Sequence, residues 1–286
     1  MARIVQGSPV LVALLRSIGW PGAAKEGPLT IIDATVGVAL LCVPFEGTGR
    51  WGERRQVERC KAERAIVDFD PSGLDGAERE TFTRLAHRGV VDLERLLLKG
   101  AVRREPVRFV VSARVDMSRT FGRTVLLPLR RVKSREAPYL HETVHALLPS
   151  PHRSTWLTEG LACYLESWVA ENVGGYDAHV FSGAGDRRIH EAARGHLRSA
   201  RGRHVLPWVG VTGEPPRLFE DRAGVARPFY VLAHSFTKYL VERLGLSIVV
   251  GLAGGRNPEE ALARLTGRDA AAWRADWLSA SPRAQR

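Results

Sequence analysis

The sequence predicts an α+β fold, in which a small mixed sheet with its helices is followed by a mainly helical C-terminal part. Short apolar segments bounded by turn residues, which are typical of strands, occur at residues 65–69, 107–111 and 124–129. From residue 138 onward the apolar residues recur at helical spacing instead. The 286 residues with 44% apolar content allow one globular domain of about 200 residues and an additional N-terminal segment.

The N-terminal residues differ from the rest, so we expect an extension at residues 1–64 and one domain at residues 65–286. An apolar stretch at residues 29–45 predicts a signal or anchor segment, because its run from residue 34 to residue 45 has the length of a signal-peptide core and not of a membrane span. Asp33 counts against a standard signal, and an extension that packs on the core is an equal alternative. This stretch favours export or membrane anchoring over the cytoplasm. The charged residues 50–64 predict an exposed helix or linker.

The net charge of +11 first suggests a nucleic-acid or anionic-lipid partner. Most of the 42 basic residues are arginines, however, and they are scattered without a long run or an interleaved aromatic platform. A coding bias towards arginine explains this charge equally well. We therefore expect no specific nucleic-acid binding, and an acidic substrate or polyanionic partner stays an alternative. The three cysteines show no spacing that defines a disulfide framework or a metal finger.

The predicted elements before the helical part follow from local signals. The strand at residues 65–69 ends at a turn sequence, Asp-Pro-Ser-Gly, and a helix with apolar periodicity follows at residues 75–99. The second strand is expected at residues 107–111 and the third at residues 124–129. Pro128 has no N–H to donate to a neighbouring strand, which favours an edge position for the third strand.

The next helix carries the most specific motif of the chain. Pro138 suits a first helical turn, the apolar residues after it recur at helical spacing, and Pro149 ends the segment. Within it, residues 141–145 read His-Glu-Thr-Val-His, the H-E-x-x-H pattern. Residues four positions apart share one helix face, so His141 and His145 can offer two imidazoles to a zinc ion while Glu142 reaches a bound water. The alternative is a solvated helix with two unrelated histidines.

A catalytic zinc ion needs a third protein ligand and keeps one position for water. A histidine six residues after the second motif histidine is excluded, because that position holds proline and His152 is one residue out of register. Glu159 offers a carboxylate near the start of a helix with an apolar stripe at residues 157–168. A surface Glu favoured by the helix dipole is the alternative. Gly160 predicts that this helix packs tightly, against the H-E-x-x-H helix.

Together, H-E-T-V-H and the later run W-L-T-E-G-L-A-C-Y-L-E resemble the gluzincins, and specifically the peptidase MA-like domain family. The aminopeptidase N family has a similar second run after a longer gap, whereas thirteen residues separate His145 from Glu159 here. The resemblance covers roughly residues 66–280, including an aromatic-rich helix at residues 229–240 and terminal helices at residues 261–277. It implies a zincin-like fold.

This resemblance implies a gluzincin-type zinc metallopeptidase that acts on a peptide or protein substrate. His141, His145 and Glu159 would bind Zn²⁺, and Glu142 would be the general base. A strand at residues 123–130 would pair with the extended substrate. A catalytically weak zincin-fold binding or regulatory module at a membrane surface, associated through the N-terminal segment, is the main alternative. A basic nucleic-acid binder with an accidental motif is a weaker one.

Four further residues have expected roles. By its position in the family-like helix, Tyr230 is the candidate donor to the oxyanion, and His234 one turn later is the alternative; either ring could instead simply pack in the core. Glu166 could orient a ligand histidine or be exposed. Cys163 is read as a small buried residue, because a fourth protein ligand would close the site. We also expect the irregular segment within residues 172–228 to cover the site.

Overall fold

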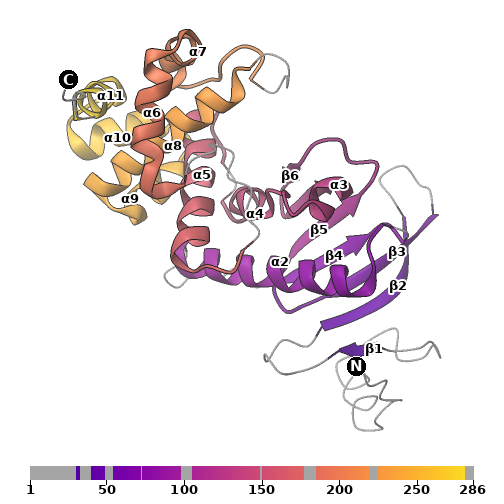
Figure 1. The fold of residues 1–286 in the computed structure, drawn as a ribbon. Coiled ribbons are helices and arrows are strands. Elements are labelled where there is room, and N and C mark those ends of the chain that lie inside the picture. Colours follow the sequence, from indigo (N-terminus) through magenta and orange to yellow (C-terminus); the bar gives the residue numbers. More distant parts are fainter. Residues whose placement is uncertain are drawn as a thin grey trace.

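The computed structural model describes residues 30–32, 40–48, 54–71, 73–97, 105–148, 150–176, 185–218 and 224–280. A mixed sheet lies at one end of the chain's fold and a group of helices at the other, with helix α4 (Tyr139–Leu147) between them (Figure 1). The α+β prediction is therefore confirmed, with the sheet first and the helices after it.

The sheet has seven described strands in the order β1-β2-β3-β4-β5-β7-β6. Neighbours from β1 to β4 are antiparallel, β4–β5 and β5–β7 are parallel, and β7–β6 is antiparallel. The strands are β1 (Thr30–Ile32), β2 (Leu40–Thr48), β3 (Arg54–Lys61), β4 (Ala65–Phe69), β5 (Val107–Ser112), β6 (Arg119–Phe121) and β7 (Thr124–Pro128).

Helix α2 lies between β4 and β5 in the chain, and the helices after the last strand form the C-terminal part. Before α4 the described helices are α2 (Gly76–Leu97) and the short α3 (Leu129–Lys133). The later ones are α5 (Thr155–Asn172), η2 (Asp186–Arg188), α6 (Ile189–Arg198), α7 (Ala200–Val205), η3 (Leu206–Trp208), α8 (Ala226–Leu244), α9 (Leu246–Ala253), α10 (Pro258–Thr266) and α11 (Ala270–Ala280).

The three predicted strands are present as β4, β5 and β7, while β1, β2, β3 and β6 were not predicted. The expectation of a helix or linker at residues 50–64 is wrong, because β3 pairs with both β2 and β4. In β3 the charged residues that indicated a linker belong to a strand, and the register sets Cys60, which is disulfide-bonded, opposite Cys42. A disulfide at Cys60 was not expected from the cysteine spacing.

The sheet continues across the expected boundary between residues 64 and 65, since β3 and β4 are paired strands. Part of the expected signal or anchor stretch, residues 40–45, belongs to β2, while residues 1–29 and 33–39 lie outside the described part. Both the division into extension and domain and the membrane association stay predictions. Among the described helices, none combines the length and the apolar character needed to span a bilayer.

The edge strand beside the helices is β6. Strand β7 is paired on both sides, with β5 and with β6, so the expectation that it is an edge strand is wrong. Pro128 is tolerated because it is the last residue of β7. The short β6 was missed because its Arg-Thr-Phe sequence has no apolar alternation, and Gly122, with φ of 56°, turns the chain between the two strands.

The core between the sheet and its helices contains an aromatic cluster. Phe82 of α2 makes edge-to-face contacts with Phe69 of β4, Phe109 of β5 and Tyr139 of α4, at centroid distances of 6.1, 6.3 and 5.6 Å. Such contacts add specific geometry to the burial of large apolar area. They fix α4 against α2 and the sheet, and α4 carries the H-E-x-x-H motif.

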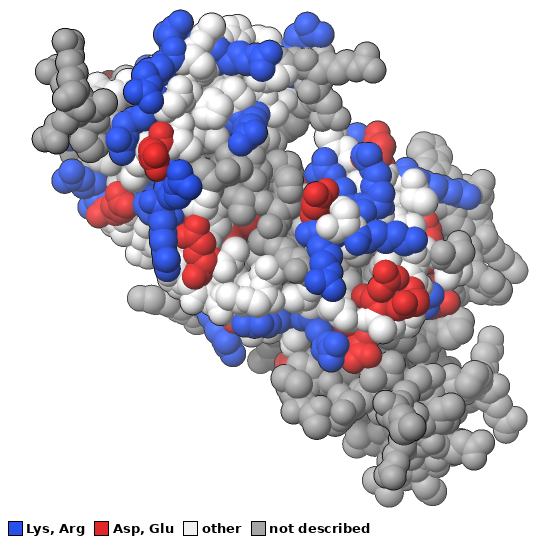
Figure 2. Space-filling view, in the orientation of Figure 1, with Lys and Arg blue, Asp and Glu red and all other residues white. Residues whose placement is uncertain are grey.

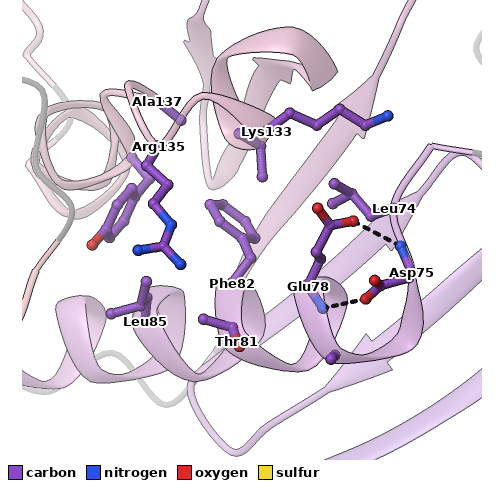
Figure 3. A pocket seen from close by; sticks show the side chains of 12 residues that line it. Leu74, Asp75, Glu78, Thr81, Phe82, Leu85, Lys133, Arg135 and Ala137 are labelled. Atoms are coloured by element: carbon purple, nitrogen blue, oxygen red, sulfur yellow. Dashed lines mark hydrogen bonds between the residues drawn. The ribbon is translucent and has the colours of Figure 1, made fainter.

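Helix α2 begins at a capping box. The backbone N–H of Asp75 donates to Glu78, and the N–H of Glu78 donates to the Asp75 carboxylate, at 2.9 and 2.8 Å (Figure 3). A cavity of about 260 Å³ lies between this end of α2 and the segment after α3. Among the described residues that line it, none belongs to a group that could hold a metal ion.

Helices α5 and α8 pack closely, and Gly160 is the reason. A Cβ atom added at Gly160 would lie 2.6 Å from the carbonyl oxygen of Ala233 and would overlap the side chain of Thr237. The close packing expected from this glycine is present, but its partner is α8 and not the H-E-x-x-H helix. Because Gly160 adjoins Glu159, this contact also positions the Glu159 side chain.

Candidate metal centre

Helix α4 places the two motif histidines side by side. The imidazoles of His141 and His145 have centroids 4.8 Å apart, and their Nε2 atoms are 3.1 Å apart. His141 is almost fully buried, and the His145 side chain is 18% exposed. The i, i+4 spacing therefore directs both Nε2 atoms to one point, as the sequence predicts.

Glu159 of α5 supplies a third donor at the same point. Its Oε2 atom lies 3.1 Å from Nε2 of His141 and 3.6 Å from Nε2 of His145. Donors at zinc distances of about 2.0–2.1 Å in a tetrahedral arrangement are separated by roughly 3.3 Å. The three separations bracket this value, so the donor set fits a zinc ion with one position left for a fourth ligand.

The charge state of the three donors follows from their mutual contacts. Burial alone would raise the pKa of Glu159, but the charges and hydrogen bonds of His145 and His141 hold it well below its usual range. Burial would lower the pKa of His145, yet Glu159 raises it overall. The carboxylate is thus ionised at neutral pH, which is the form that binds a metal.

Glu142 points into the same space and is held by Thr120 of the edge strand β6. The Thr120 hydroxyl lies 2.7 Å from Oε2 of Glu142 and 3.0 Å from the backbone oxygen of Glu142. Glu142 is 5% exposed. Thr120 was not predicted as a site residue, because its approach to α4 depends on the pairing of β6 with β7. A Thr-Phe-Gly turn sequence before the third strand is the signal that could have indicated it.

Behind the cluster, the other ring nitrogen of His141 faces α5. Its Nδ1 atom is 3.8 Å from Sγ of Cys163 and 3.8 Å from Oε2 of Glu166, and both side chains are fully buried. Glu166 therefore lies beside a motif histidine, not at the surface. Cys163 contacts the face of His141 opposite to Nε2, and it does not belong to the three-donor cluster.

Tyr230 of α8 closes the other side of the cluster. Its ring centroid is 6.1 Å from that of His141, edge to face, and the residue lines the same cleft. Burial, and then the charge of Glu159, raise the pKa of Tyr230 well above its usual value. The phenol therefore keeps its proton over the physiological pH range and can donate a hydrogen bond in the cleft.

His234 lies away from the cluster, and its expected catalytic role stays a prediction. Its side chain is fully buried, its Nε2 atom is 3.5 Å from Oδ1 of Asp186, and it is absent from the described residues that line the cleft. Lys238 donates to the same Asp186 carboxylate at 2.6 Å. His234 thus belongs to a buried polar cluster that joins η2 to α8.

The cluster opens into a cleft of about 880 Å³ between β6, α3, α4, α5 and the start of α8. Five of the six expected site residues line it, namely His141, Glu142, His145, Glu159 and Tyr230. From the segment that was expected to cover the site, residues 172–228, Leu218, Ala226 and Arg227 reach the lining. A cleft of this size is sufficient for a peptide segment.

No protein-family model and no curated protein sequence matches the chain. Similar solved structures are M1 zinc metallopeptidases. One from Deinococcus radiodurans is 15% identical, with a TM-score of 0.47, and the aligned part covers 86% of this chain and 53% of that structure's chain.

Two further structures of this kind are mutants, one from Deinococcus radiodurans bound to a Tyr-Ser-Ala substrate and one bound to L-tryptophan. Each is 15% identical with a TM-score of 0.49, and they cover 83% and 84% of this chain. The chain spans about half the length of these structures.

Proposed function

We propose that the chain is a zinc-dependent peptidase with a zincin-like fold of gluzincin type. The observation that carries the proposal is the donor set of His141, His145 and Glu159, whose mutual separations of 3.1–3.6 Å suit one tetrahedral ion. Two neighbouring groups add the functions that hydrolysis needs. Glu142 is a buried carboxylate held by a hydroxyl, and Tyr230 is a protonated phenol in the same cleft.

A zinc ion bound there would polarise the substrate carbonyl and lower the pKa of a water molecule towards neutrality. Glu142 would accept a proton from the attacking water and deliver it to the leaving amine. Thr120 would hold the Glu142 carboxylate in the position for this transfer. The phenol of Tyr230 would donate a hydrogen bond to the oxyanion that develops on the carbonyl. Glu166 would fix the ring of His141 from behind.

The substrate would bind along the edge strand β6, in place of the strand at residues 123–130 that the family resemblance implied. Among the described strands β6 pairs only with β7, and its residues line the cleft next to Glu142. An unpaired strand edge can bind the backbone of an extended peptide whatever its side chains are. Phe121, at the end of β6, is 54% exposed and is available to contact a substrate side chain.

The test is hydrolysis of a peptide library by the zinc-loaded wild type and by the Glu142→Gln and His141→Ala variants. We expect the wild type to cleave peptides, Glu142→Gln to retain zinc and lose activity, and His141→Ala to lose both. Unchanged hydrolysis by Glu142→Gln would refute the mechanism. Full zinc occupancy without any hydrolysis by the wild type would favour a binding or regulatory module instead.

A further inference from the structure

The walls of the cleft carry an excess of positive charge. Apart from Glu142 and Glu159, which serve the metal cluster, Asp116 is the only carboxylate among the described residues of the lining. A bound zinc ion would itself be balanced by those two carboxylates. Four lining residues are arginines: Arg119, Arg130, Arg131 and Arg227.

The arginines lie on both sides of the cleft. Arg119 belongs to β6 and Arg130 and Arg131 to α3, while Arg227 is in the first turn of α8 on the opposite side (Figure 1). Figure 2 shows Lys and Arg side chains gathered over the β6 and α3 region, beside the hollow that separates it from the helical part. A ligand in the cleft therefore meets guanidinium groups from two directions.

Asp116 offsets one of these charges. Its carboxylate is 86% exposed and 3.7 Å from the guanidinium of Arg119, whose side chain is 49% exposed. Arg130 donates to the backbone oxygen of Asp116 at 3.0 Å, which neutralises no charge and leaves further N–H donors of the guanidinium. The described lining thus presents about three net positive charges to a ligand.

We propose that this cleft selects peptide segments that carry acidic side chains. The proposal rests on the peptidase function above and names its substrate class. A guanidinium matches a carboxylate with two parallel hydrogen bonds, and a concave site strengthens such pairs relative to open water. A lysine-rich segment would be repelled by the same walls and would find Asp116 as its one partner there. The unpaired edge of β6 would bind the backbone of the segment.

Binding is measured first, separately from turnover. The zinc-loaded full chain with Glu142→Gln is titrated with a fluorescent Glu-rich peptide and with the same peptide carrying Gln in place of Glu. We expect the Glu-rich peptide to bind about tenfold tighter or more, as several weak charge pairs would give. The preference should vanish near 1 M NaCl, where the screening length is about 3 Å.

Variants of the cleft arginines then test which side chains cause the preference for the Glu-rich peptide. In the same protein, Arg227→Gln should lower affinity for the Glu-rich peptide about two- to fivefold, and the double change Arg130→Gln with Arg131→Gln should lower it further. The Gln peptide should be unaffected. The matched control is Arg264→Gln on α10, where the side chain is 74% exposed and outside the cleft lining. Zinc content and circular dichroism report that each variant is folded.

Three results would overturn the proposal. They are equal affinity for the two peptides, an equal loss in Arg264→Gln, and tighter binding of single-stranded DNA with the same arginine dependence. The peptidase function is judged separately, from wild-type hydrolysis of the two peptides. Equal kcat/KM for the two peptides would contradict the preference for acidic peptides but would support the peptidase function. Selective binding of the Glu-rich peptide without any hydrolysis would contradict the peptidase function but would support an acidic ligand.

Discussion

Replacing Gly160 by alanine tests how the third donor is positioned. The new Cβ atom would lie 2.6 Å from the backbone oxygen of Ala233, which cannot rotate away as a side chain can. Helices α5 and α8 must therefore separate. Overpacking of this kind costs about 1–3 kcal/mol, occasionally more. The higher helix propensity of alanine relative to glycine offsets up to about 1 kcal/mol of this cost. Taking the upper end of the cost, we expect a net loss of about 2 kcal/mol.

For a domain of this size that loss lowers Tm by about 4–8 °C, measured by thermal unfolding of the zinc-free protein. Zinc affinity, measured by competition with a chelator, should fall as well, because Glu159 adjoins the moved residue. Gly195→Ala is the matched control: this glycine lies within α6, and an added Cβ would meet no atom within 4 Å. It should raise stability by about 0.5–1 kcal/mol. A Tm for Gly160→Ala that is unchanged, or raised as in the control, would refute the reasoning.

Three other predictions concern the cleft and the buried cluster. Thr120→Val removes the hydroxyl that contacts Glu142, so kcat/KM should fall about tenfold or more with zinc content unchanged, while Thr120→Ser should restore most of it; equal activity of Val and Ser would contradict this. Tyr230→Phe should lower kcat about 10²-fold with little change in KM, measured in steady-state kinetics; a change in KM alone would speak against an oxyanion contact. Burial lowers the pKa of His234 in the folded protein, although the Asp186 carboxylate acts to raise it. As pH falls below about 6.5, this histidine therefore takes up a proton in the unfolded chain before it does so in the folded one, and the folded state loses stability. In Tm measurements between pH 7 and pH 5 on the zinc-free protein, His234→Gln should therefore show a smaller acid-induced decrease than the wild type, and an equal decrease would show that His234 does not contribute.

The parts of the site that the sequence predicts are those set by local structure. His141 and His145 share a helix face through their spacing alone, and Glu159 lies near the start of the next helix within a recognisable flanking sequence. A short connection joins the two helices that carry these residues, so the helices can adopt few arrangements relative to each other. The sequence also predicts β4, β5, β7 and α2, because the apolar periodicity of these elements directly reflects their burial.

What the sequence did not indicate depends on contacts between distant segments. Thr120 reaches Glu142 only because β6 pairs with β7. His234 lies one turn beyond Tyr230, where Asp186 of η2, 48 positions earlier in the chain, pairs with it. No periodicity encodes that partner. The charged strand β3 was mistaken for a linker because its pairing with β2 and β4, not its composition, makes it a strand.

The most direct test of the account is the zinc coordination of the purified protein, measured by X-ray absorption at the zinc edge. We expect one zinc ion per chain with two imidazole nitrogens at about 2.0–2.1 Å and a carboxylate oxygen at about 2.0–2.2 Å, and loss of the oxygen ligand in Glu159→Ala. A protein without zinc, or a sulfur ligand at about 2.3 Å supplied by Cys163, would contradict it.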